Sequence, residues 1–114
     1  MGLTCHRSRT VTLALGMSQA ERRCTIAHET EHILRGPVAP SAAAGEERAI
    51  DRTVAGLLLP LGSEVVDALV SARGQLETAA DALWVDDYLL QVRLAALTTR
   101  DREYAGQRLS VLLV

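Results

Sequence analysis

Aromatic residues are scarce in this chain of 114 residues. They make up 3% of the sequence, with no phenylalanine, one tryptophan and two tyrosines, although 48% of the residues are hydrophobic. The core must therefore consist of leucine, valine and alanine rather than aromatic rings, and a composition of this kind favours packed helices. The length suits a single domain, since domains with one core are usually about 100 to 150 residues long.

Cysteine is also rare, and neither sign of charge predominates. Cys5 and Cys24 are too few for the disulfide framework of a small secreted domain, and they lack the Cys-x-x-Cys spacing of a metal site. We therefore expect two reduced thiols in a cytoplasmic protein. The 12 basic and 14 acidic residues give a net charge of −2. No overall positive field would attract a phosphate backbone, which argues against nucleic acid as a partner.

Long hydrophobic runs are absent as well. No stretch approaches the roughly 20 apolar residues that span a membrane, so we expect a soluble protein with no membrane partner. Arg7 and Arg9 precede the apolar residues 11–15, as in a signal peptide, but this run is too short. It also alternates with β-branched residues, which is typical of a strand. We expect one strand over residues 8–15, ended by a turn at Gly16.

The next segment carries clear start and stop signals for a helix. Ser18 and Glu21 have the spacing of a capping box, in which each side chain accepts a hydrogen bond from the other residue's backbone. Gly36 can adopt a left-handed cap conformation, and Pro37 cannot continue a helix. These signals predict a helix from residue 18 to about residue 34.

A second helix is expected over residues 46–59, after a loop at 37–44 that contains two prolines and little charge. Its apolar residues recur at helical spacing until Pro60. The remaining chain predicts four shorter helices, at 63–72, 75–83, 86–97 and 100–109. Together these elements predict a mostly helical α+β fold. A single domain, 1–114, would comprise a core at 1–60 and a helical C-terminal subregion at 61–114.

The first predicted helix contains the motif His28-Glu29-Thr30-Glu31-His32, which has the HExxH pattern. On a helix, residues four apart lie on one face, so His28 and His32 can direct their imidazole nitrogens at one zinc ion. Glu29 projects about 100° around the helix from His28. It could therefore accept a proton from water at the metal without being a ligand itself.

Two histidines leave a catalytic zinc site one protein ligand short. Glu47 and Asp51 on the second helix are also four residues apart, so Glu47 could supply the third ligand. Asp51 could then accept a hydrogen bond from the outer nitrogen of His28 or His32. Glu46 is a rival ligand, but it lies out of line with the apolar face. Two histidines and a glutamate also suit other divalent ions, such as manganese or iron.

Each of these residues also has an ordinary structural interpretation. The HExxH pattern occurs by chance, and His28 and His32 could be solvated residues on an exposed helix face. Asp51 could be a surface acid. For Cys24, four residues before His28, we expect packing in the core rather than metal ligation.

Two longer segments, residues 22–29 and 47–60, resemble the ImmA/IrrE-type metallopeptidases of bacteria, phages and mobile elements. The resemblance covers about residues 2–110, and these segments are more specific than the HExxH pattern alone. Two positions depart from the family's pattern. Thr30 replaces the usual apolar residue, and Asp51 stands where asparagine is commoner. These departures from the family's pattern bear on catalytic efficiency and substrate choice more than on metal binding.

The resemblance implies a zincin-like fold, with zinc held by His28, His32 and Glu47, and with Glu29 as the catalytic residue. It further implies a metalloendopeptidase whose substrate is a protein or peptide, often a phage or mobile-element repressor. The strand at 8–15 would then be able to pair with an extended substrate segment.

A residue that stabilises the transition state is harder to nominate from the sequence. Tyr88, Tyr104 and His6 are the candidate side chains, and no spacing selects among them. If no donor lies beside the metal, the chain would fit a second class, a non-catalytic interaction module on a zincin scaffold.

A third class is a DNA-binding helix-turn-helix, since residues 79–93 have a similar rhythm. The second helix of this unit would open with Asp86 and Asp87, which repel phosphates. The same residues fit a helix cap better.

Overall fold

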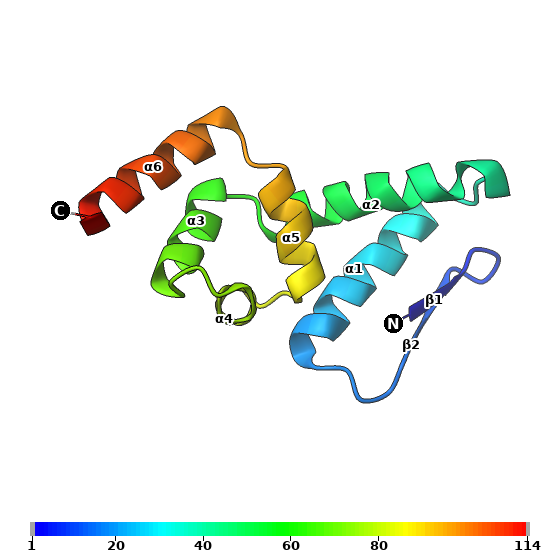
Figure 1. The fold of residues 1–114 in the computed structure, drawn as a ribbon. Helices are drawn as coiled ribbons and strands as arrows, with labels where there is room; N and C mark the ends of the chain where they lie inside the picture. The colour runs from blue at the N-terminus through cyan, green and yellow to red at the C-terminus, as the bar shows by residue number, and fades with distance from the viewer. Residues whose placement is uncertain (1, 114) are drawn as a thin grey trace.

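The computed structural model describes residues 2–113, with side chains described through residue 110. Within them, a two-stranded sheet precedes a series of helices (Figure 1). The elements are β1 (Gly2–Cys5), β2 (Thr10–Leu13), α1 (Gln19–Arg35), the short 3-10 helix η1 (Pro40–Ala42), α2 (Ala43–Leu58), α3 (Gly62–Ser71), α4 (Leu76–Leu83), α5 (Asp87–Ala95) and α6 (Thr99–Leu113). The predicted mostly helical α+β fold is confirmed.

The N-terminal strands form a hairpin, which the sequence analysis predicted only in part. The strands are antiparallel, with Gly2 opposite Leu13 and Cys5 opposite Thr10. The expected strand at 8–15 is too long at both ends, because a turn occupies residues 6–9 and pairing stops at Leu13. Arg9 in this turn has a φ of 53°. The strand β1 was not predicted, since four residues carry too little alternation to be recognised.

Helix α1 begins and ends where its local signals predict. Both bonds of the capping box are present, from the Glu21 amide to Ser18 Oγ and from the Ser18 amide to Glu21 Oε1, each 3.1 Å long. Beyond the last residue, Gly36 has a φ of 82° and a ψ of 174°. Glycine adopts this conformation readily and other residues do not. Pro37 follows, and the helix cannot continue.

Helix α2 starts three residues earlier than predicted, at Ala43 rather than at residue 46. The expected loop at 37–44 is correspondingly short, because its second half forms η1. Pro40 stands at the start of η1, where its fixed φ favours a helical turn. The alanines that follow have high helix propensity, so they extend the helix rather than a loop. The helix ends at Leu58, as Pro60 requires.

The four C-terminal helices are present, with boundaries shifted by one or two residues, except that α6 continues to Leu113. Trp84 ends α4 in the left-handed conformation, with φ 61° and ψ 42°. In residues 2–113, no single helix is long and apolar enough to cross a membrane. Only the pair Pro40–Leu58 and Gly62–Ser71, bent by 80°, passes that length and composition test together.

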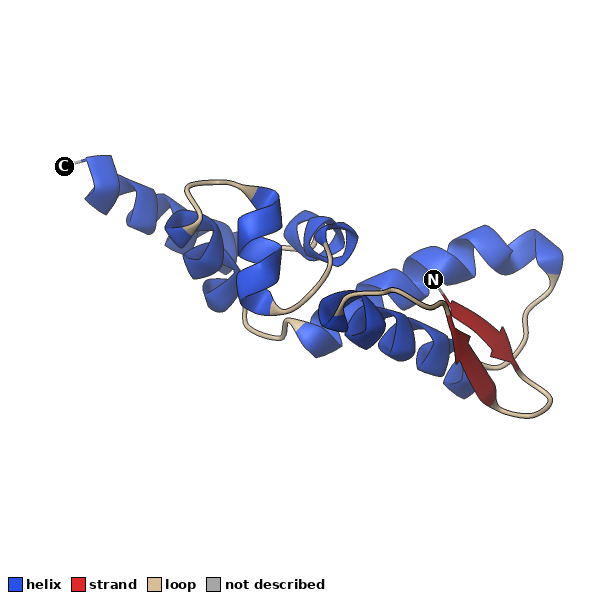
Figure 2. Cartoon of the chain, turned by 90° about the horizontal axis from the view of Figure 1, so that it is seen from below, coloured by secondary structure: helices blue, strands red, loops and turns tan. Residues whose placement is uncertain are grey.

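The core is built from aliphatic side chains, as the composition predicted. Helix α2 packs between α1 and α5, and α3 contacts both α4 and α6. Arg93 of α5 is buried among these helices, where its Nε donates to the Leu59 carbonyl over 2.7 Å and satisfies the end of α2. The hairpin and α6 lie toward opposite ends of the molecule (Figure 2). The largest fully buried side chains are Ile50, Val54, Val65, Val85 and Leu90.

Candidate metal centre

The two histidines of the HExxH motif lie on one face of α1. The ring centroids of His28 and His32 are 5.0 Å apart, and the side chains are 23% and 20% exposed. This follows from helical geometry, since residues four apart are stacked one turn from each other. The Nε2 atoms of both rings lie beside Glu47 of α2.

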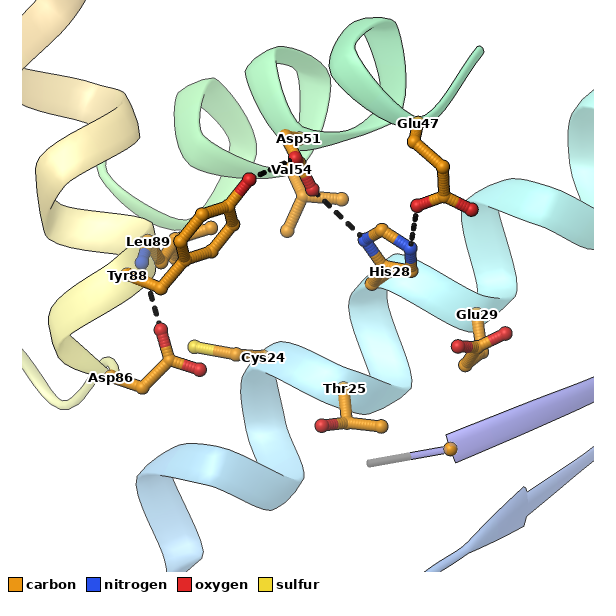
Figure 3. A pocket seen from close by; sticks show the side chains of 11 residues that line it. Cys24, Thr25, His28, Glu29, Glu47, Asp51, Val54, Asp86, Tyr88 and Leu89 are labelled. Atoms are coloured by element: carbon orange, nitrogen blue, oxygen red, sulfur yellow. Dashed lines mark hydrogen bonds and ion pairs between the residues drawn. The ribbon is translucent and has the colours of Figure 1, made fainter. Parts of the chain in front are cut away.

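Glu47 of α2 contacts both histidines. Its Oε2 lies 2.9 Å from His28 Nε2, and its Oε1 lies 2.8 Å from His32 Nε2 (Figure 3 shows the first contact). Ligand atoms of the three residues all lie within 4.8 Å of one another. Two imidazole nitrogens and one carboxylate form a donor set that zinc accepts at catalytic sites, so the residues present fit that ion.

The neighbouring Glu46 does not belong to this cluster. Its carboxylate forms an ion pair with Arg35 at the end of α1. Arg35 also lies 3.8 Å from a carboxylate oxygen of Glu31, one turn earlier in the same helix. The structure therefore distinguishes the two adjacent glutamates, as their different angles around α2 suggested.

Asp51 approaches the outer nitrogen of His28. The distance from Asp51 Oδ1 to His28 Nδ1 is 3.2 Å. Asp51 thus faces Nδ1 while Nε2 faces Glu47, and a carboxylate on the outer nitrogen is how metal-binding imidazoles are commonly oriented. Of the two histidines considered for this contact, the structure selects His28. The other carboxylate oxygen, Oδ2, accepts a hydrogen bond of 2.5 Å from the Tyr88 hydroxyl.

A pocket of about 470 Å³ opens beside His28 and Glu47, and His32 is not among the residues that line it. Side chains of α1, α2 and α5 form its walls, and Figure 3 shows them converging on the space next to His28. The only hairpin residue among those that line it is Gly2 of β1, and β2 contributes none. The lining residues are Gly2, Cys24, Thr25, His28, Glu29, Glu47, Asp51, Val54, Asp86, Tyr88 and Leu89.

Glu29 lines the same pocket but lies on the hairpin side of α1, whereas His28 faces α2 (Figure 3). The hydroxyl of Thr4 in β1 donates to Glu29 Oε2 and also lies 3.2 Å from the Glu29 carbonyl oxygen. The carboxylate is thus held by the strand. Sequence reasoning missed Thr4, because its contact spans 25 residues and the strand itself was not predicted.

Gly2 is the other hairpin residue that the sequence analysis missed. A Cβ atom at this position would lie 2.7 Å from Thr25 Cγ2 and 3.1 Å from Glu29 Cγ. A distance of 2.7 Å is a steric clash, so only glycine allows β1 to pack this closely on α1. The close approach is what brings the Thr4 hydroxyl to Glu29.

The three candidate transition-state donors occupy different places. Tyr88 borders the pocket, with its hydroxyl bonded to Asp51, which raises the pKa of the phenol above its usual value. The ring of His6 lies edge-on to His32, with centroids 6.5 Å apart. Tyr104 lies outside the site, because its hydroxyl donates to Asp67 of α3 over 2.7 Å. The structure therefore removes Tyr104 from the candidates.

Cys24 lies in the pocket wall and belongs to the core, with 5% of its surface exposed. Burial raises the pKa of its thiol, which keeps the sulfur protonated and argues for the packing role predicted from the sequence. Cys24 is not part of the cluster of possible ligands. Cys5 is exposed, and both cysteines are free thiols.

Comparison with known proteins adds no family assignment. No family model, no curated protein and no solved structure matches the chain.

Proposed function

We propose that the chain is a zinc-dependent metallopeptidase of the ImmA/IrrE type. The observation that carries this proposal is the cluster of His28, His32 and Glu47, whose ligand atoms lie within 4.8 Å of one another, with His28 and Glu47 lining an open pocket. Three protein ligands next to accessible space are the arrangement of a catalytic zinc site rather than a structural one.

In this proposal, His28, His32 and Glu47 would hold a zinc ion, which when bound would supply Lewis acidity toward water and the peptide carbonyl group. Glu29 accepts the proton of the attacking water and passes it to the leaving amine. The Thr4 hydroxyl occupies Glu29 Oε2, so Oε1 is the oxygen left to take up the proton. Asp51 keeps His28 in the tautomer that leaves Nε2 unprotonated.

The substrate would be an extended segment of a protein, such as a phage or mobile-element repressor in the cytoplasm. Gly2 of β1 borders the pocket, and β1 pairs with β2 along one edge only in the described sheet. An extended peptide could pair with the other edge. We therefore assign substrate pairing to β1, in place of the strand expected at 8–15.

A second candidate is an interaction module that keeps the scaffold without cleaving peptides. The contact between Glu29 and Thr4 favours this alternative, because it holds the carboxylate on the hairpin side of α1. A Glu29 that cannot turn toward bound water would leave metal binding intact and remove catalysis.

The helix-turn-helix alternative receives no support from the fold. Arg93 is the only basic residue of α5, and it is buried against the Leu59 carbonyl. Asp86 caps the helix by accepting a bond of 2.8 Å from the Leu89 amide. A helix with an acidic start and a buried arginine offers nothing to a phosphate backbone.

The test is cleavage of a mixed peptide library by the zinc-loaded protein, read by mass spectrometry. We expect Glu29→Gln to lower the rate about 100-fold to 10,000-fold while zinc stays bound. Glu31→Gln is the matched control, because Glu31 shares the helix but contacts Arg35 instead of the pocket. Equal rates for wild type and Glu29→Gln would contradict peptidase activity and favour the interaction module.

A further inference from the structure

The two tyrosines of the chain make the same kind of bond in different places. The Tyr88 hydroxyl donates to Asp51 of α2 over 2.5 Å, and the Tyr104 hydroxyl donates to Asp67 of α3 over 2.7 Å. Among the described side chains, Asp67 otherwise contacts Arg108, whose Nε lies 3.4 Å from its Oδ1 on the surface. Asp51, in contrast, leads to His28.

A chain of three polar contacts runs from α5 into the ligand cluster. Tyr88 bonds Asp51 Oδ2, and Asp51 Oδ1 lies 3.2 Å from His28 Nδ1. The other nitrogen of His28, Nε2, lies 2.9 Å from Glu47. Each oxygen of the Asp51 carboxylate therefore has a separate partner, and the two contacts together fix its rotation. An aspartate with one contact could turn freely, because the torsion next to its carboxylate is soft.

Tyr88 is well placed to hold Asp51, because the backbone beneath it is anchored. It lies in the first turn of α5, where the Asp86 cap and the buried side chains of Leu89 and Leu90 fix the start of the helix. The ring itself borders the pocket and is largely exposed. Its hydroxyl could bond to water instead, and its bond to a charged carboxylate is of the stronger, charge-assisted kind.

We propose that Tyr88 is a positioning residue for the metal centre, acting through Asp51 on His28. By holding Oδ2, it aims Oδ1 at His28 Nδ1, and this keeps Nε2 directed at Glu47 and His32. The hydroxyl hydrogen is thereby committed to Asp51, so Tyr88 is not the transition-state donor. The inference rests on the proposed metal site. It adds that α5, which lies outside the segment 1–60 that carries the ligands, is also part of that site.

The first readout is zinc affinity, measured by competition with a chromophoric chelator. We expect Tyr88→Phe to weaken zinc binding about tenfold, toward the lower end of the effect of losing a partner of a metal ligand. Tyr104→Phe is the matched control, since it removes an equivalent tyrosine–aspartate bond away from the site, and we expect wild-type affinity. In an Asp51→Ala background, Tyr88→Phe should have no further effect.

The second readout needs no metal. The imidazole ¹⁵N signals of His28 in the metal-free protein should shift in Tyr88→Phe and stay unchanged in Tyr104→Phe. Wild-type zinc affinity together with unshifted His28 signals in Tyr88→Phe would overturn the inference. So would a loss of zinc affinity on Tyr88→Phe that is equally large in the wild-type and Asp51→Ala backgrounds. If the wild type binds no zinc, the proposed function fails, and the His28 signals alone decide whether Tyr88 orients the ring.

Discussion

The hydroxyl of Thr4 donates a hydrogen bond to the carboxylate of Glu29, and this bond joins the hairpin to the motif helix. It links the strand that borders the pocket to the residue assigned as general base. The same bond serves both functional candidates, because it either orients Glu29 for proton transfer or holds it away from the metal. Changing Thr4 therefore separates them.

If the bond orients Glu29 for catalysis, Thr4→Val is expected to lower kcat for peptide cleavage about tenfold, the equivalent of about 1.4 kcal/mol. Thr4→Ser keeps a hydroxyl and should restore most of the rate. Zinc content should stay at the wild-type level in both variants, because neither touches a ligand. Thr12→Val, at an exposed position of β2, provides the control. A faster Thr4→Val enzyme would mean that the bond restrains Glu29.

Gly2→Ala is expected to destabilise the protein by about 1 to 3 kcal/mol, because the new methyl group would clash with Thr25 and push β1 away from α1. Gly56→Ala is a matched control within α2, where a Cβ atom meets nothing within 4 Å. There we expect stabilisation of about 0.5 to 1 kcal/mol. Urea denaturation of both variants measures the difference. A Gly2→Ala protein as stable as the wild type would show that the strand is not packed on the helix.

The two cysteines should differ in reactivity toward a thiol reagent. Hydrogen bonds from Ser8 lower the pKa of the exposed Cys5 thiol, whereas burial raises the pKa of Cys24. We expect Cys5 to react quickly at about pH 8, and Cys24 to react only at the rate of unfolding. Mass spectrometry of the labelled peptides identifies each site. Equal labelling rates in the native protein would contradict the burial of Cys24.

The raised pKa of Cys24 also makes stability depend on pH on the alkaline side. Above the ordinary thiol pKa of 9.0 the unfolded chain loses the thiol proton while the folded chain retains it. The unfolded state then binds fewer protons, so the free energy of unfolding falls as the pH rises. The stability contributed by the protonated Cys24 thiol is fully present below pH 9.0 and is lost as the pH rises through the higher pKa of the folded state. Thermal melts of the wild type and Cys24→Ala across this range should converge as the pH rises.

Local signals were enough to predict α1 and the face on which its histidines lie. The capping box, the glycine stop and the four-residue spacing act within one or two turns of helix, so the sequence alone determines them. Glu47 was predicted for a related reason. It shares a face with Ile50 and Val54, which are buried, and this orientation directs it at α1.

Contacts between distant residues could not be predicted in the same way. The bond between Tyr88 and Asp51 joins residues 37 apart, and no periodicity relates their positions. The packing of β1 depends on the absence of a side chain at Gly2. The sequence does not show that Gly2 lies against Thr25, so the need for glycine there could not be predicted. Tyr104 shows the reverse error, since a suitable residue type was nominated without knowledge of its place in the fold.

Elemental analysis of the purified protein and its variants tests the metal centre most directly. We predict about one zinc per chain in the wild type, in Glu29→Gln and in the control Glu46→Ala, whose carboxylate pairs with Arg35. His28→Ala and Glu47→Ala should lose the metal. A wild-type chain that binds no divalent ion after zinc is added, or variants of His28 and Glu47 that retain it, would contradict the assignment.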